Sequence, residues 1–248
     1  MHPLDEYLAQ GEHLHQDFKF FLSDAKKIAR SLAAFANTEG GRLLVGVKDN
    51  GKVVGLKHKD EEAYVVEAAA LVFCKPQVAY QTHVVDYYGK AVLVVEVPQS
   101  KKAPHRAPDE KGVPTCYIRK ADENKAASAL EEKVLQLTHS GKPLHVSFTP
   151  RHERLLSYLN NQPGHNIQAG HDIQAGHDIQ HGHNIQAGHD IQAGHNIQAG
   201  HDIQPVDGQS PALPYDVDTL AAQCLLTRQE CLLALAQLIA SGVLPPCP

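Results

Sequence analysis

The stretch FANTEGGRLLVGVKDNG, residues 35–51, joins the end of a predicted helix to a predicted buried strand. Apolar residues recur at helical spacing over residues 25–36, and Ser23-Asp24 is typical of a helix start. The glycine pair at 40–41 ends this helix, and RLLVGVK (42–48) is a continuous apolar run typical of a strand buried on both faces. The stretch therefore predicts a helix packed against a sheet.

The flanking sequence extends this unit on the C-terminal side. Asn50-Gly51 is a strong hairpin signal, because both central residues of the turn need positive φ. The further predicted elements are a returning strand at 53–56, a helix over 60–73, a strand–turn–strand over 78–98, a strand over 115–120 and a helix over 122–138. This order predicts a compact α+β domain, with a mixed sheet and packed helices, over residues 1–140.

A second, mostly helical region follows. Helices are predicted over 150–160 and 217–224, and Thr227 to Glu230 fits a capping box that opens a helix ending at Ser241. This is the outline of a winged helix-turn-helix, with a linker and first helix at 141–163 and the remainder at 205–248. The last helix holds one arginine and is apolar on most sides. We therefore expect it to make a partner or homo-oligomer contact rather than to read DNA bases.

A hexapeptide repeat, GH[ND]IQA, occupies residues 164–204 between these helices. A helix would carry a glycine in every unit, and an extended or solenoid arrangement would bury only a thin apolar face. Clustered imidazoles bind zinc or nickel readily, but a loose array lacks the fixed geometry of a selected site. We therefore expect a disordered, low-complexity insertion in the winged-helix-like domain.

Composition limits the classes of function. The 248 residues contain 23 Lys and Arg against 28 Asp and Glu, and 20 of those 23 cations lie in residues 1–150. Any nucleic-acid contact is thus expected from a local basic patch in the first domain. No apolar run approaches the roughly 20 residues that span a membrane, and the first residues are polar and acidic. We expect a cytoplasmic protein without membrane contact, whose five scattered cysteines are free thiols.

Several segments of the first domain resemble one known family. They stand in the order and approximate spacing of the Schlafen AlbA_2 domain: GEHLHQDFK (11–19), FANTEGG (35–41), LLVGVKDNG (43–51), VVGL (53–56) and YIRKADEN (117–124). The resemblance implies a nucleic-acid-binding domain, with DNA or RNA as partner. Many prokaryotic members also carry a C-terminal helix-turn-helix.

The resemblance also implies a metal-dependent ribonuclease site. Its three acidic residues match Glu12, Asp17 and Asp49 here, and such a carboxylate cluster would hold Mg²⁺ or Mn²⁺ beside a scissile phosphate. Asp17 stands where the family has Glu, and Lys48 stands where it has Asp. Both changes weaken the nuclease interpretation, and an Asp-Asn-Gly turn explains Asp49 without any catalytic role.

Basic residues provide the candidate phosphate contacts: Lys19, Lys26, Lys27, Arg30, Arg119 and Lys120. Arg119 is the foremost candidate, because a guanidinium offers a planar fork suited to phosphate. The leading hypothesis is a nucleic-acid-binding, regulatory protein. The alternatives are a divalent-metal-dependent endoribonuclease and a protein–protein interaction or dimerisation module.

Overall fold

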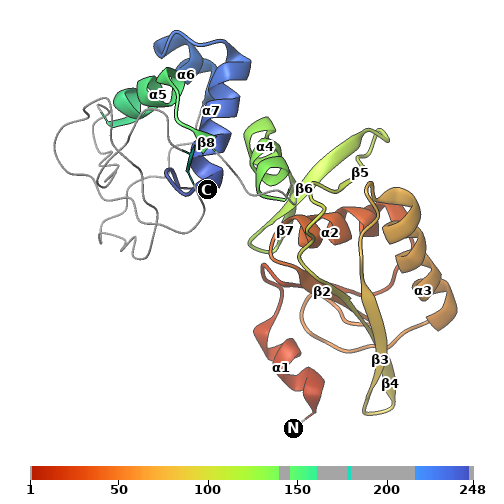
Figure 1. The fold of residues 1–248 in the computed structure, drawn as a ribbon. Helices are drawn as coiled ribbons and strands as arrows, with labels where there is room; N and C mark the ends of the chain where they lie inside the picture. Colours follow the sequence, from red (N-terminus) through yellow and green to blue (C-terminus); the bar gives the residue numbers. More distant parts are fainter. Residues whose placement is uncertain (1, 140–145, 161–177, 180–215, 246–248) are drawn as a thin grey trace. The chain divides into compact units, whose positions relative to one another are not determined.

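A computed structural model describes residues 2–139, 146–160, 178–179 and 216–245. The chain divides into two compact units, Met1–Ala127 and Ser128–Pro248 (Figure 1). Apart from residues 178–179, the hexapeptide repeat lies outside the described residues, so the expectation of disorder there stays a prediction.

The first unit contains a mixed four-stranded sheet and a smaller antiparallel sheet. Its elements are α1 (Pro3–Gln10), β1 (Gln16–Lys19), α2 (Ala25–Asn37), β2 (Gly41–Val45), α3 (Lys59–Ala68), the π-helical turn η1 (Ala69–Phe73), β3 (Gln81–Tyr87), β4 (Lys90–Val97), β5 (Arg106–Pro108), β6 (Pro114–Lys120) and β7 (Glu123–Ala126). The larger sheet has the order β1-β2-β4-β3, with β1 parallel to β2, and the smaller one has the order β5-β6-β7. The predicted α+β class is confirmed.

Helix α2 is the centre of this unit. The Asp24 side chain caps it by accepting from the amides of Lys26 and Lys27, as the sequence predicts. Strand β2 is buried on both faces: Leu43 packs in the core that contains α2, whereas Leu44 packs in a second core with Leu4 of α1. The strand is thus buried on both faces, as its continuous apolar run predicts, because a helix covers each face.

Two predicted elements differ in the structure. Residues 48–51 form a turn, in which the amide of Gly51 donates to the carbonyl of Lys48 (2.8 Å). It is not the expected turn centred on Asn50-Gly51 with two positive φ values, because Gly51 has positive φ (77°) and Asn50 does not. The returning strand at 53–56 is wrong, because Val53 makes a single bridge to Val47 and β4 pairs with β2 instead. A strand pairs with whichever neighbour the tertiary fold places beside it, and a local turn signal does not decide this.

The predicted helix over 122–138 is also wrong in its first part. Residues 123–126 form β7, which pairs with β6 across a tight turn in which Ala121 has positive φ (52°). Ser128 then opens α4 (Ala129–Thr138) through a capping box with Glu131. Charged residues alone do not distinguish an exposed hairpin strand from an exposed helix. The start of helix α4 is instead marked by the capping box of Ser128 and Glu131.

The second unit is mostly helical. Besides α4, it contains β8 (Val146–Ser147), α5 (Pro150–Asn160), β9 (Asp178–Ile179), α6 (Val217–Gln223) and α7 (Arg228–Ala240). The capping box of Thr227 and Glu230 is confirmed, as are the three predicted helices. The winged-helix assignment stays a prediction. In the described ranges, no helix is long and apolar enough to cross a membrane.

Helix α7 is the core of the second unit. It contacts α4, α5 and α6. Its residues Cys231, Leu235 and Leu238 are fully buried. Its apolar character therefore arises from packing inside the unit. Leu232 and Leu233 are only partly buried, and the predicted partner contact of this helix stays a prediction.

Candidate nucleic-acid interface

Two of the three predicted acidic residues lie together beside β1. The Glu12 carboxylate accepts from the amide of Phe18 (2.9 Å). Burial raises the pKa of Glu12, and a hydrogen bond between its carboxyl group and that of Asp17 raises this pKa further. Asp17 itself is buried, with 4% of its surface exposed. Glu12 is therefore more readily protonated than an exposed glutamate.

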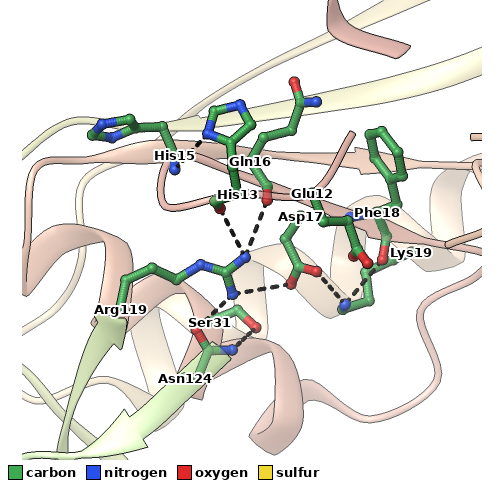
Figure 2. Close-up of polar contacts among 10 residues, drawn as sticks. All are labelled: Glu12, His13, His15, Gln16, Asp17, Phe18, Lys19, Ser31, Arg119 and Asn124. Carbon is green, nitrogen blue, oxygen red and sulfur yellow. Dashed lines mark hydrogen bonds and ion pairs between the residues drawn. The ribbon is translucent and has the colours of Figure 1, made fainter. Parts of the chain in front are cut away.

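The Asp17 carboxylate is already neutralised by cations of the same unit. Lys19 Nζ lies 2.7 Å from Oδ1, and Arg119 Nη1 lies 3.8 Å from Oδ2 (Figure 2). The placement of Lys19 follows from β1, because residues two apart on a strand point to the same face. Asp17 is thus built into an internal ion-pair network.

Asp49 does not join this pair. It is exposed on the turn after β2, and Lys48 beside it lies over the Phe20 ring (5.4 Å from Nζ to the centroid). Within the described ranges, no three His, Cys, Asp or Glu residues are grouped so that they could hold a metal ion. The residues that the resemblance implies for Mg²⁺ or Mn²⁺ therefore do not fit a three-carboxylate metal site in this arrangement.

Arg119 lies in the interior of the unit, with 3% of its surface exposed. Nη2 donates to the carbonyls of Gln16 (3.0 Å) and His13 (3.2 Å), and Nη1 donates to Asn124 Oδ1 (3.0 Å) (Figure 2). Burial lowers its pKa, which the charge of Asp17 opposes. The sequence made Arg119 the first candidate for phosphate contact. In the structure its guanidinium instead holds β1 and β7 to β6.

The FANTEGG segment supplies the polar contacts around this network. Asn37 is buried and joins α2 to the second sheet: its Nδ2 donates to the carbonyls of His105 and Tyr117, and its Oδ1 accepts from the His105 amide. Thr38 accepts from the Arg119 amide (2.9 Å). Gly40 has φ +79°, and a Cβ there would lie 2.8 Å from the Val97 carbonyl. The segment is thus a connector between the sheets.

An open groove lies at the start of α2. It has a volume of about 540 Å³, and its lining contains three cations (Lys19, Lys27 and Arg30), two aromatic rings (Phe21 and Tyr117) and two carboxylates (Asp24 and Glu123), together with Asn124. Asn124 also donates to Ser31 (2.9 Å), so the floor of the groove is continuous with the Arg119 network (Figure 2). Sequence reasoning missed the aromatic residues, although Phe20 and Phe21 directly follow Lys19.

The groove collects three of the six predicted basic residues. Arg30 is oriented by a hydrogen bond from Nε to the Pro108 carbonyl (2.8 Å), and its guanidinium lies 5.9 Å from the Tyr117 ring centroid. Lys27 is exposed and makes no ion pair with the part of the chain that the structure describes. Lys26 instead lies over the Phe73 ring (6.0 Å), and neither Lys120 nor Arg119 lines the groove.

The raised pKa of Glu12 predicts a pH-dependent effect of Glu12→Gln. Because the folded-state pKa lies above the unfolded one, the contribution of Glu12 to stability is fully present at acid pH and is lost as pH rises through the folded pKa. The glutamine keeps an amide donor toward Asp17 at every pH. We expect the variant to gain stability over the wild type as pH rises from acid toward neutral, through the raised pKa of Glu12.

Thermal unfolding across this pH range measures the effect. Glu61→Gln, at an exposed position of α3, controls for the loss of one negative charge. A stability difference between Glu12→Gln and the wild type that stays constant with pH would contradict a raised pKa of Glu12.

One family model matches most of the first unit. Residues 12–128 match the family model "Schlafen, AlbA_2". Among solved structures, the chain is similar to the DIP2311 protein from Corynebacterium diphtheriae, with 20% identity, a TM-score of 0.43, and coverage of 59% of this chain and 29% of that chain. It is also similar to the N-terminal domain of an ATP-dependent DNA helicase RecG-related protein from Nitrosomonas europaea, with 27% identity, a TM-score of 0.37, and coverage of 47% and 84%. This chain thus spans less than two thirds of the DIP2311 chain. The segment 12–128 carries the sequence pattern of the Schlafen AlbA_2 family.

Proposed function

We propose that the first unit binds nucleic acid by holding backbone phosphates in the groove at the start of α2. The observation that carries this proposal is the convergence of Lys19 from β1 with Lys27 and Arg30 from α2 on one open cavity. Residues three apart on a helix lie on one face, so Lys27 and Arg30 present their charges side by side. The resemblance to Schlafen AlbA_2 domains, which implies nucleic-acid binding, supports the same function.

The three cations have different roles in this proposal. Lys27 is exposed and unpaired among the described residues, so it provides a mobile charge for a phosphate. Arg30 is held by the Pro108 carbonyl, which reduces the entropy lost when it binds. Lys19 is shared with Asp17 and contributes less, because its charge is already balanced. The net charge of −5 leaves binding dependent on this local patch and sensitive to salt.

The test measures fluorescence anisotropy of labelled oligothymidine, oligouridine and duplex DNA with the full chain over a salt series. We expect Lys27→Gln combined with Arg30→Gln to weaken binding about tenfold at low salt. Losing two phosphate contacts should also reduce the slope of log K against log salt by about 1.4 to 1.8. The reason is that each cation releases counterions from the phosphate it neutralises.

The matched control is Lys101→Gln combined with Lys111→Gln, which removes two exposed charges outside the groove. Equal weakening by both pairs would show that only net charge matters and would overturn the groove as the site. The same probes incubated with Mn²⁺ and with EDTA test the alternative. Metal-dependent cleavage that Asp49→Ala abolishes would replace the binding function with the nuclease.

A further inference from the structure

The groove carries an aromatic ring whose exposure the fold does not require. Phe21, in the loop between β1 and α2, is 48% exposed, although burying a phenylalanine is favourable. Its orientation is nevertheless held, because Phe20 contacts it edge-on (centroids 5.4 Å apart, interplanar angle 85°). An exposed ring beside the proposed phosphate site is suited to stack against a nucleic-acid base.

A further cation, which does not itself line the groove, lies close to this ring. Lys57 Nζ lies 5.4 Å from the Phe21 centroid and 4.7 Å from the Phe20 centroid, and Lys57 is exposed. Lys27 lines the groove with Phe21. The ring is thus adjacent to positive charge from two separate segments. This arrangement suits a nucleic-acid strand, because its phosphates alternate with its bases.

We infer that the groove takes single-stranded nucleic acid, with one base stacked on Phe21 and the adjacent phosphates on Lys27 and Lys57. This inference rests on the proposed function and adds the strandedness of the ligand. Bases in a duplex are already stacked on both faces and present only their edges in the grooves. An unpaired base exposes its face, so a half-exposed ring in a concave site selects single strands. The shared chemistry is that of DNA and RNA single strands.

The test compares full-chain variants at position 21. We expect Phe21→Ala to weaken binding of oligothymidine or oligouridine about five- to tenfold. Binding of an abasic phosphodiester strand of the same length should stay unchanged, because it offers phosphates without bases. Wild-type binding should favour the base-bearing single strands over the duplex. The two base-bearing probes distinguish a DNA ligand from an RNA ligand.

Phe21→Trp gives a second, direct readout. The chain contains no tryptophan, so this residue would be the only indole emitter. We expect the variant to keep wild-type affinity and its emission to be quenched by oligothymidine but not by the abasic strand. The quenching requires a base in contact with the ring, which a merely structural role of Phe21 does not produce.

The outcomes separate this inference from the proposed function. Stacking on Phe21 is overturned, while groove binding stands, if Phe21→Ala weakens binding of the abasic strand as much as binding of oligothymidine. The same holds if the duplex binds as tightly as the single strands. If the wild type binds none of the probes, the proposed function fails and this inference fails with it. Selective loss for base-bearing strands together with quenching establishes the single-stranded site.

Discussion

Replacing Arg119 with methionine is expected to destabilise the first unit by about 3–5 kcal/mol. Methionine keeps much of the side-chain volume but removes every hydrogen-bond donor. The carbonyls of His13 and Gln16 would then lose a buried donor. Asp17 would lose one of its two cations in a nearly water-free position, and an uncompensated buried charge is costly.

Hydrogen exchange during urea unfolding, read on peptides from β1 and β2, measures this stability separately from that of the second unit. Lys52→Met is the matched control, because it makes the same kind of change at an exposed position. Arg119→Lys keeps the charge but not the fork, so an intermediate loss is expected, and this variant remains informative if Arg119→Met does not fold. A loss below about 1 kcal/mol would show that Arg119 does not hold β1 in place.

The local features of the fold were predictable from short-range signals. The span of α2 follows from apolar spacing, the Asp24 cap and the glycine pair, and each of these acts within a few residues. The hairpin of β3 and β4 and the capping box of α7 were predictable for the same reason. Burial of β2 on both faces follows from its unbroken apolar run.

The interior position of Arg119 could not be predicted from its neighbours in sequence. A lone arginine on a short strand is more often exposed, and its burial depends on carbonyl groups about a hundred residues earlier in the chain. Only the tertiary fold brings β1 beside β6. The groove has the same origin, since Lys19 and Arg30 meet there through the packing of β1 and α2.

The same network explains why acidic residues that match a family's metal-binding positions need not form a metal site in this chain. The closeness of Glu12 and Asp17 follows from their position beside β1, and their charge is balanced by Lys19 and Arg119. Asp49, in contrast, lies on an exposed turn closed by the hydrogen bond from the Gly51 amide to the Lys48 carbonyl. The three carboxylates therefore have two separate structural roles: Glu12 and Asp17 belong to the network beside β1, and Asp49 belongs to the turn after β2.

Phe35→Ala is expected to destabilise the first unit by about 3–5 kcal/mol. The ring is fully buried and lies between two features of the network: the Arg119 guanidinium is 4.9 Å from its centroid, and a Cβ at Gly41 would overlap it. Its removal leaves a cavity that the glycine backbone cannot fill. Phe21→Ala is the matched control, because the same change at a half-exposed position should alter stability by less than about 0.5 kcal/mol.

The double variant of Phe35 and Arg119 then tests whether the ring and the guanidinium act together. A buried cation over an aromatic face contributes about 1–2 kcal/mol, so the losses of Phe35→Ala and Arg119→Met should sum to more than the loss of the double variant by about that amount. Phe35→Leu, which leaves a smaller cavity, keeps the cycle measurable if the alanine variant unfolds. Additive losses would mean that Phe35 only fills space. Non-additive losses would mean that the Phe35 ring stabilises the Arg119 guanidinium in the position from which it contacts β1. The β1 side of the groove would then depend on Phe35, a residue that does not line it.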